Sequence, residues 1–361
     1  MRAFGSLMAL EALALVALVA ASVVPYFLNK SSERLFTPFP GFVALRFPVE
    51  GKPTQGKSRI VEASLDLAIV ITVILMLIGY TLIVRTLVPK SPAGGAFVPL
   101  IPGVTVPVNL LVSLIWIIAI AVVVHELFHY LACVWQGIRV RSAGVGLLLF
   151  FPIAFVEPDE ENLMRSPPRA RARVYSAGPA ANGVLAALAL VLITVLIEKG
   201  VYVIDVEEGS PAWAAGIKKG DVIIEVNGQR VNNLIDLRKA ISSGELLKVV
   251  VLRGEEKVTL LVNKDGRERI GVYVLPWVPK GPLRGLPPEE AAKAVQTLFW
   301  THGVNLGLGV VNALPMFITD GGKLVSEVKR VRRLSSVADA FQLITVILFV
   351  HALVGSLRPL A

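Results

Sequence analysis

The chain has 361 residues, of which 54% are hydrophobic and only 17% are charged, and its formal net charge is +9. A soluble globular domain carries roughly a quarter charged residues, so this composition excludes an ordinary soluble protein. The high apolar content also excludes a disordered chain. No nucleic-acid-binding motif accompanies the positive charge, and a single cysteine, Cys133, excludes an intramolecular disulfide framework. We therefore expect an integral membrane protein with a modest water-soluble part.

Six apolar runs are long enough to cross a bilayer, whose hydrocarbon core takes roughly 20 helical residues. We predict a polytopic α-helical membrane protein with transmembrane helices near residues 7–28, 65–84, 108–133, 173–197, 291–314 and 337–357. Lysine and arginine gather in the segments that follow the first, third and fifth runs, and such segments stay in the cytoplasm. Both termini and the insertion at 198–290 are then expected outside a multi-pass protein of the cell membrane.

The third run ends in His125-Glu126-Leu127-Phe128-His129. Two histidines four residues apart share one helix face, about 6 Å apart along the axis, which suits two imidazoles on one Zn²⁺. Glu126 projects away from His125 and is better placed to take a proton from a metal-bound water than to ligate. The alternative is a pair of hydrogen-bonding histidines, but ionisable groups inside a membrane helix are functional by default. We predict a zinc centre with Glu126 as its catalytic acid/base.

Residues 143–156 form an apolar stretch too short to cross the membrane, with Gly144, Gly146 and Pro152 where a helix disfavours them. We predict a membrane-embedded β-hairpin that lines a wet cavity or is buried in protein. Asn182 lies further along, among the small residues of Ser176-Ala177-Gly178-Pro179-Ala180-Ala181. Packing is its favoured role, because small residues allow helices to approach closely, and donation of a hydrogen bond to an oxyanion is the alternative.

Residues 198–275 change character, with short strands bounded by glycine and aspartate. The string GSPAWAAGIKKGDVIIEVNGQRV resembles a PDZ domain, which implies a small α+β fold. The resemblance implies a groove between a strand at 201–206 and a helix at 234–241 that takes a peptide by strand addition. A steric filter without a bound peptide is the alternative. A Pro/Gly-rich linker at 276–290 then leads to the C-terminal membrane region at 291–361, and the N-terminal membrane region covers 1–197.

A catalytic zinc needs a third protein ligand and one open position. Asp320 closes the segment Asn312-Ala313-Leu314-Pro315-Met316-Phe317-Ile318-Thr319 at the same expected depth as the two histidines, whereas His302 and His351 lie towards the other face. We therefore expect Asp320 as the third ligand, with a plain turn before Gly321 as the alternative. Asn312 could donate a hydrogen bond to an oxyanion or, equally, to a neighbouring helix.

Together, HELFH, the hairpin running into FVEPDEE, SAGPAAN, the inserted PDZ-like segment and NALPMFITDGG resemble the site-2 protease family of intramembrane zinc metalloproteases, in its archaeal and eukaryotic branch. The resemblance implies one Zn²⁺ held by His125, His129 and Asp320, with Glu126 as catalytic acid/base and Asn312 as a substrate or transition-state contact. It also implies that substrates are membrane-spanning proteins and that the hairpin offers an edge to an unwound substrate segment.

Three other functions remain open at this point. A catalytically inactive membrane scaffold would use the PDZ-like domain for partners and the metal for structure. A secondary transporter would also carry intramembrane histidine and aspartate, but we find no inverted repeat. A different membrane zinc protease would use a glutamate as the third ligand, and zinc retention in an Asp320→Ala variant would indicate it.

Overall fold

The computed structural model describes residues 2–27, 34–49, 58–87, 99–101, 105–327 and 334–356. It divides into two compact units, one formed by residues 1–187 with 301–361 and the other by residues 188–300. Several basic residues on which the predicted orientation depends, among them Lys30, Lys52 and Arg330, lie outside the described residues.

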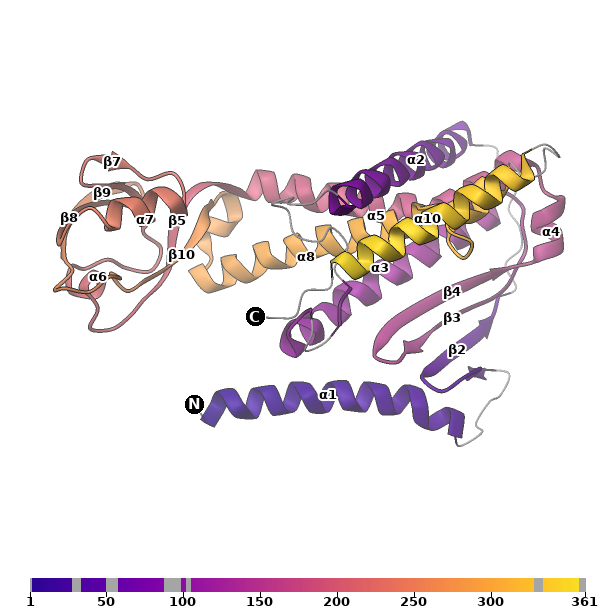
Figure 1. Cartoon of the computed structure of the whole chain (residues 1–361), viewed down its shortest axis with the longest axis horizontal. Helices are drawn as coiled ribbons and strands as arrows, with labels where there is room; N and C mark the ends of the chain where they lie inside the picture. Colours follow the sequence, from indigo (N-terminus) through magenta and orange to yellow (C-terminus); the bar gives the residue numbers. More distant parts are fainter. Residues whose placement is uncertain are drawn as a thin grey trace. The chain divides into compact units, whose positions relative to one another are not determined.

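Long helices dominate the first unit (Figure 1). Four of the predicted spans coincide with helices that are long and apolar enough to cross a membrane, and the first span contains a shorter apolar helical stretch, Val16–Phe27. The fifth span coincides with helix α8, whose polar residues, such as His302 and Asn305, lower its hydropathy below that of the other four. The expected count of about six is therefore supported for four helices in the described part of the chain. The long helices are α1 (Arg2–Phe27), α2 (Arg59–Leu87), α3 (Val108–Trp135), α5 (Pro168–Leu196), α8 (Pro288–Ala313) and α10 (Ser335–Gly355).

The predicted hairpin is present and belongs to a larger sheet. Strands β3 (Val140–Leu148) and β4 (Phe151–Pro158) pair antiparallel, as expected for 143–156. Two strands that we did not predict, β1 (Leu35–Phe36) and β2 (Phe42–Pro48), extend the sheet in the order β1-β2-β3-β4. Because β2 covers the outer side of β3, the free edge of the hairpin is β4, and β4 packs along α3 (Figure 1).

Apolar packing and buried ion pairs hold the helices of the first unit together. Helices α2, α8 and α10 share one apolar cluster that includes Leu75, Leu314 and Ala352. Cys133 lies fully buried in a second apolar cluster. The guanidinium of Arg171, only 1% exposed, donates to the carboxylate of Glu327 at 2.9 and 2.5 Å. This pair joins the start of α5 to the end of the short helix α9 (Asp320–Ser326).

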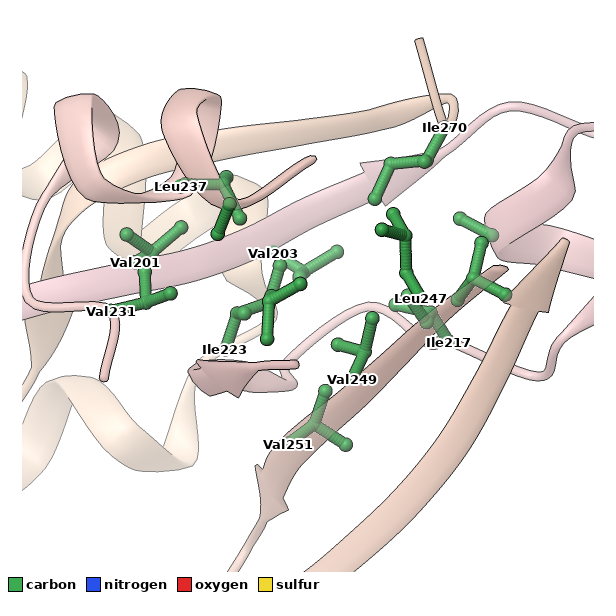
Figure 2. Close-up of a cluster of buried hydrophobic side chains, with 14 residues drawn as sticks. Val201, Val203, Ile217, Ile223, Val231, Leu237, Leu247, Val249, Val251 and Ile270 are labelled. Atoms are coloured by element: carbon green, nitrogen blue, oxygen red, sulfur yellow. The ribbon is translucent and has the colours of Figure 1, made fainter. Parts of the chain in front are cut away.

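The second unit is a mainly antiparallel sheet in the order β10-β5-β6-β8-β9, with β7 paired to β6. Its core is aliphatic, with Val203 of β5, Ile223 of β6 and Val249 of β8 fully buried and Leu237 of the helix α7 packed over them (Figure 2). The elements are β5 (Ile197–Val206), α6 (Pro211–Ala214), β6 (Val222–Val226), β7 (Gln229–Arg230), α7 (Leu234–Ile241), β8 (Leu246–Arg253), β9 (Glu256–Asn263) and β10 (Val272–Pro279).

Two features of this unit differ from the sequence-based expectation. Strand β10 runs to Pro279, four residues into the stretch expected to be a linker, because it pairs with β5 back to Ile197. The same pairing places β5 between β10 and β6, so the backbone of β5 has no free edge for strand addition. The prediction that a peptide adds to the strand at 201–206 is therefore wrong, because that strand is not at the edge of the sheet. In this sheet the free edge on that side belongs to β10.

Candidate metal centre

Helix α3 brings His125 and His129 onto one face, as their four-residue spacing predicts. Their Nε2 atoms lie 3.1 Å apart, and both side chains are almost fully buried, at 5% and 9% exposed. An Oδ2 oxygen of Asp320 lies 3.1 Å from each of the two nitrogens. The structure therefore brings together the three residues expected to be ligands. Each offers one ligand atom, and these atoms all lie within 4.8 Å of one another.

Asp320 reaches this position because it is the first residue of α9. The N-cap Thr319 accepts a hydrogen bond from Gly322 N at 3.2 Å, and its hydroxyl donates to the carbonyl of Leu314 at 2.5 Å. These bonds fold the start of α9 back onto the end of α8. A Cβ on Gly321 would lie 1.9 Å from the carbonyl oxygen of Ala313, so this close return needs glycine. A plain turn, the alternative expectation for Asp320, does not describe this position.

The hydrogen bonds on the other side of each imidazole fix where its proton lies. His129 Nδ1 lies 2.7 Å from the carbonyl of Val174, and His125 Nδ1 lies 2.6 Å from Oδ1 of Asn182. A carbonyl oxygen only accepts, so each Nδ1 carries hydrogen and each neutral imidazole presents a bare Nε2. While both imidazoles are neutral, two bare nitrogens and a carboxylate oxygen meet at 3.1 Å. Such a triangle calls for a positive charge inside it, either a proton or a metal ion.

Helix α5 forms the wall behind the two histidines. A Cβ on Gly178 would lie 2.3 Å from Nε2 of His129 and 2.6 Å from Nε2 of His125, so α5 passes closer to the ligand atoms than any side chain would permit. The small residues of the SAGPAAN segment thus allow α5 to approach α3 closely, as expected. Asn182 of this segment also contacts His125, a candidate ligand.

Asn305 on α8 was missed by the sequence reasoning. Its Oδ1 accepts a hydrogen bond from Nδ2 of Asn182 at 2.9 Å. The available signal was an amide inside an apolar helix, which is the signal that drew attention to Asn312. Asn312 itself donates its amide to the carbonyl of Leu308 in its own helix, at 3.0 Å. Its expected contact with substrate or transition state stays a prediction.

Glu126 follows His125 on α3 and lines a cavity of about 280 Å³ between α3 and the sheet. The other walls are apolar and include Tyr130 of α3, Gly144 of β3 and Phe155 of β4. A neighbouring cavity of about 330 Å³ shares Val123 and Val145 with the first and continues along the same face of the sheet. A carboxylate therefore borders an apolar groove beside the candidate ligands.

Two other histidines were disfavoured as ligands. His302 has its Nδ1 2.9 Å from the carbonyl of Ala186, and His351 is exposed on α10. Neither belongs to the cluster of His125, His129 and Asp320.

Residues 113–355, which include all three candidate ligands and well over half of the chain, match the model of peptidase family M50. The chain belongs to peptidase family M50. An uncharacterised protein of Methanocaldococcus jannaschii is 29% identical over 233 residues, 63% of this chain and 57% of that protein. A Treponema pallidum protein named "Putative zinc metalloprotease" is 27% identical over 249 residues, 53% of this chain and 55% of that protein.

These matches span somewhat more than half the length of the two relatives. Part of this M50 chain is similar in sequence to a solved PDZ domain. The PDZ domain of an SdrC-like protein from Listeria innocua is 31% identical to this part, with 21% of this chain and 92% of that domain covered and a TM-score of 0.19. Serine protease HTRA1B of Danio rerio is 42% identical over 66 residues, 18% of this chain and 14% of that protein. The M50 chain thus combines long apolar helices with a sheet-rich unit.

Proposed function

We propose that this M50 chain is a zinc endopeptidase that cleaves membrane-spanning proteins within or near their transmembrane segments. The triangle of His125, His129 and Asp320 carries the proposal, because it joins two imidazole nitrogens and one carboxylate oxygen, all buried, among long apolar helices. A purely structural pair of neutral histidines would instead set the N–H of one ring against the bare nitrogen of the other.

The donor set fits one zinc ion. Two imidazole nitrogens and one carboxylate oxygen are three protein ligands, which leaves one position for water or substrate, as in catalytic zinc sites. Ligand atoms at about 2.05 Å from a tetrahedral ion lie about 3.3 Å from one another, close to the 3.1 Å separations here. Lys323 donates to Oδ1 of Asp320 at 3.2 Å and leaves Oδ2 for the ion. The two Nδ1–H bonds keep both imidazoles in the tautomer that binds through Nε2.

A zinc ion in this site would polarise a water and a substrate carbonyl. Glu126, at the wall of the groove, would take the proton of the attacking water and pass it to the leaving amine. The apolar lining of the groove limits bulk water around this carboxylate, which strengthens the electrostatic interactions there.

The groove also suggests how substrate is held. The cavities between α3 and the sheet are lined by apolar residues and suit an extended apolar segment. A substrate helix must unwind first, because its own backbone shields its carbonyls. The free edge of β4 could pair with the extended segment. The PDZ-like unit and both termini would lie outside the cell, with the metal site towards the cytoplasm and the PDZ-like unit screening or binding what approaches.

A cleavage assay on purified protein in detergent tests this function. The Glu126→Gln variant should keep one zinc per chain but lose cleavage of a transmembrane substrate, since the amide cannot accept the proton. Glu161→Gln is the matched control, because its exposed carboxylate pairs only locally with Arg165 and should leave activity unchanged. Wild-type protein that binds zinc but shows no chelator-sensitive hydrolysis would instead support the alternative function, a catalytically inactive membrane scaffold with a structural metal. Cleavage at the wild-type rate by Glu126→Gln would reject the role of this carboxylate.

A further inference from the structure

We propose that Asn305 of α8 is a positioning residue for the metal centre and acts on His125 through Asn182. The inference deepens the proposed function, because it concerns how this chain prepares one ligand for the ion. It starts from two buried amides, Asn182 at 0% exposed and Asn305 at 2%, that lie on different helices.

The two amides and the imidazole form one directed chain of hydrogen bonds. Nδ2 of Asn305 donates to the carbonyl of Thr301 at 2.9 Å, which turns its Oδ1 towards α5. That oxygen accepts from Nδ2 of Asn182 at 2.9 Å. The second hydrogen of Asn182 Nδ2 goes to the carbonyl of Ala121 at 3.0 Å. Oδ1 of Asn182 is left to accept from Nδ1 of His125 at 2.6 Å.

This chain can run in only one direction. Asn182 Nδ2 faces two acceptors, the carbonyl of Ala121 and Oδ1 of Asn305, so a flipped amide would set its oxygen against both. The carbonyl of Thr301 can only accept, and it sets the orientation of Asn305 in the same way. The tautomer of His125, with hydrogen on Nδ1 and a bare Nε2, is therefore fixed from α8, through two amides.

The packing of α5 against α8 supports this role. A Cβ on Gly309, one turn after Asn305, would lie 3.1 Å from the carbonyl oxygen of Pro179 and 3.4 Å from Cβ of Asn182. The two helices thus come close where the amides meet. Asn182 and Asn305 could in principle serve only to hold the helices together. That simpler role would affect stability without changing the tautomer of His125.

The test measures zinc affinity by chelator competition and the His125 tautomer by ¹⁵N chemical shifts in metal-free, full-length protein. Asn182→Leu removes the direct partner of His125 and should weaken zinc binding about 10- to 100-fold. Asn305→Leu should weaken it less, about 3- to 10-fold, as expected for one indirect hydrogen bond. Both should add an Nε2–H population to His125. Asn305→Asp keeps an acceptor for Asn182 and, in its protonated form, a donor for the carbonyl of Thr301, so it should preserve the wild-type tautomer.

The double variant Asn182→Leu/Asn305→Leu separates positioning from packing. If Asn305 acts through Asn182, the double variant binds zinc as weakly as Asn182→Leu alone. Thr345→Val, which removes a buried hydroxyl that bonds Tyr80 at 2.5 Å, should change stability without changing zinc affinity. Additive losses, or an unchanged tautomer in Asn305→Leu, would overturn the proposal. If Asn305→Leu does not fold, Asn305→Ala gives the same readouts.

The failure of this inference can be told apart from failure of the proposed function. Wild-type protein that binds no zinc would contradict the proposed function. The His125 tautomer, measured by ¹⁵N chemical shifts in metal-free protein, would still test the relay, that is, the hydrogen-bond chain from Asn305 through Asn182 to His125. Wild-type protein that binds zinc and cleaves substrate, together with an Asn305→Leu variant of unchanged affinity and tautomer, would contradict the relay alone.

Discussion

Replacing Gly178 with alanine should destroy the metal centre while leaving the fold in place. The new Cβ would lie 2.3 Å from Nε2 of His129 and 2.6 Å from Nε2 of His125, whereas ordinary contact begins at 3.4 Å. The His129 nitrogen would have to move by about 1 Å, several times the roughly 0.2 Å tolerance of a zinc–ligand bond. Losing one outer hydrogen bond weakens metal binding about 10- to 100-fold, so displacing both nitrogens should cost at least about 100-fold.

The assay for Gly178→Ala is zinc affinity by chelator competition, with thermal unfolding of the metal-free protein as the measure of the fold. Overpacking of this kind costs about 1–3 kcal/mol, so the apo protein should remain folded. Gly183→Ala on the same helix is the matched control, because its Cβ would meet methyl groups of Leu75 and Ile71 at 3.0 and 3.2 Å and no candidate ligand. Gly307→Ala on α8 has open space and should be neutral or slightly stabilising. Wild-type zinc affinity in Gly178→Ala would refute the geometry of the site.

Three further outcomes are expected. Asp320→Ala should lower zinc affinity beyond the 10- to 100-fold typical of an outer partner, and full zinc occupancy would point to a glutamate ligand instead. Arg171→Met should destabilise the protein in detergent by about 3 kcal/mol, because it leaves the carboxylate of Glu327 without this guanidinium; removing both partners together should cost less. A single cysteine at the exposed turn residue Glu255, in a Cys133→Ala background, should react with impermeant thiol reagents from outside intact cells, and labelling only after lysis would reverse the proposed orientation.

The sequence predicted the long helices and the shared face of His125 and His129 because both depend on local regularities. Apolar runs gave the helices, and the four-residue spacing placed His125 and His129 on one face. Asp320 followed from the expectation that two parallel helices end at the same depth. Helix ends were less accurate, since α2 begins six residues before its predicted span and α5 begins five residues before its own.

The missed features depend on contacts between residues far apart in the chain. Asn182 meets His125 across 57 residues and Asn305 across 123 residues, and no local pattern announces either pair. Strand β2 was missed because its partner β3 follows about a hundred residues later. The peptide groove was assigned to the wrong strand for a similar reason: β10, at the far end of the domain, returns to cover β5.

The turn around Thr319 positions Asp320, the expected third ligand, with very few residues. Its hydrogen bonds to Leu314, Met316 and Gly322 all close between the end of α8 and the start of α9. This hydrogen-bonded turn thus holds the carboxylate of Asp320 at the start of α9. The chain can accommodate a whole domain between α5 and α8 without disturbing this turn, because the turn is formed only by residues that follow α8. One extra residue before Thr319, by contrast, would disrupt the hydrogen bonds from Thr319 to Leu314 and Met316 that hold the carboxylate of Asp320 against the histidines.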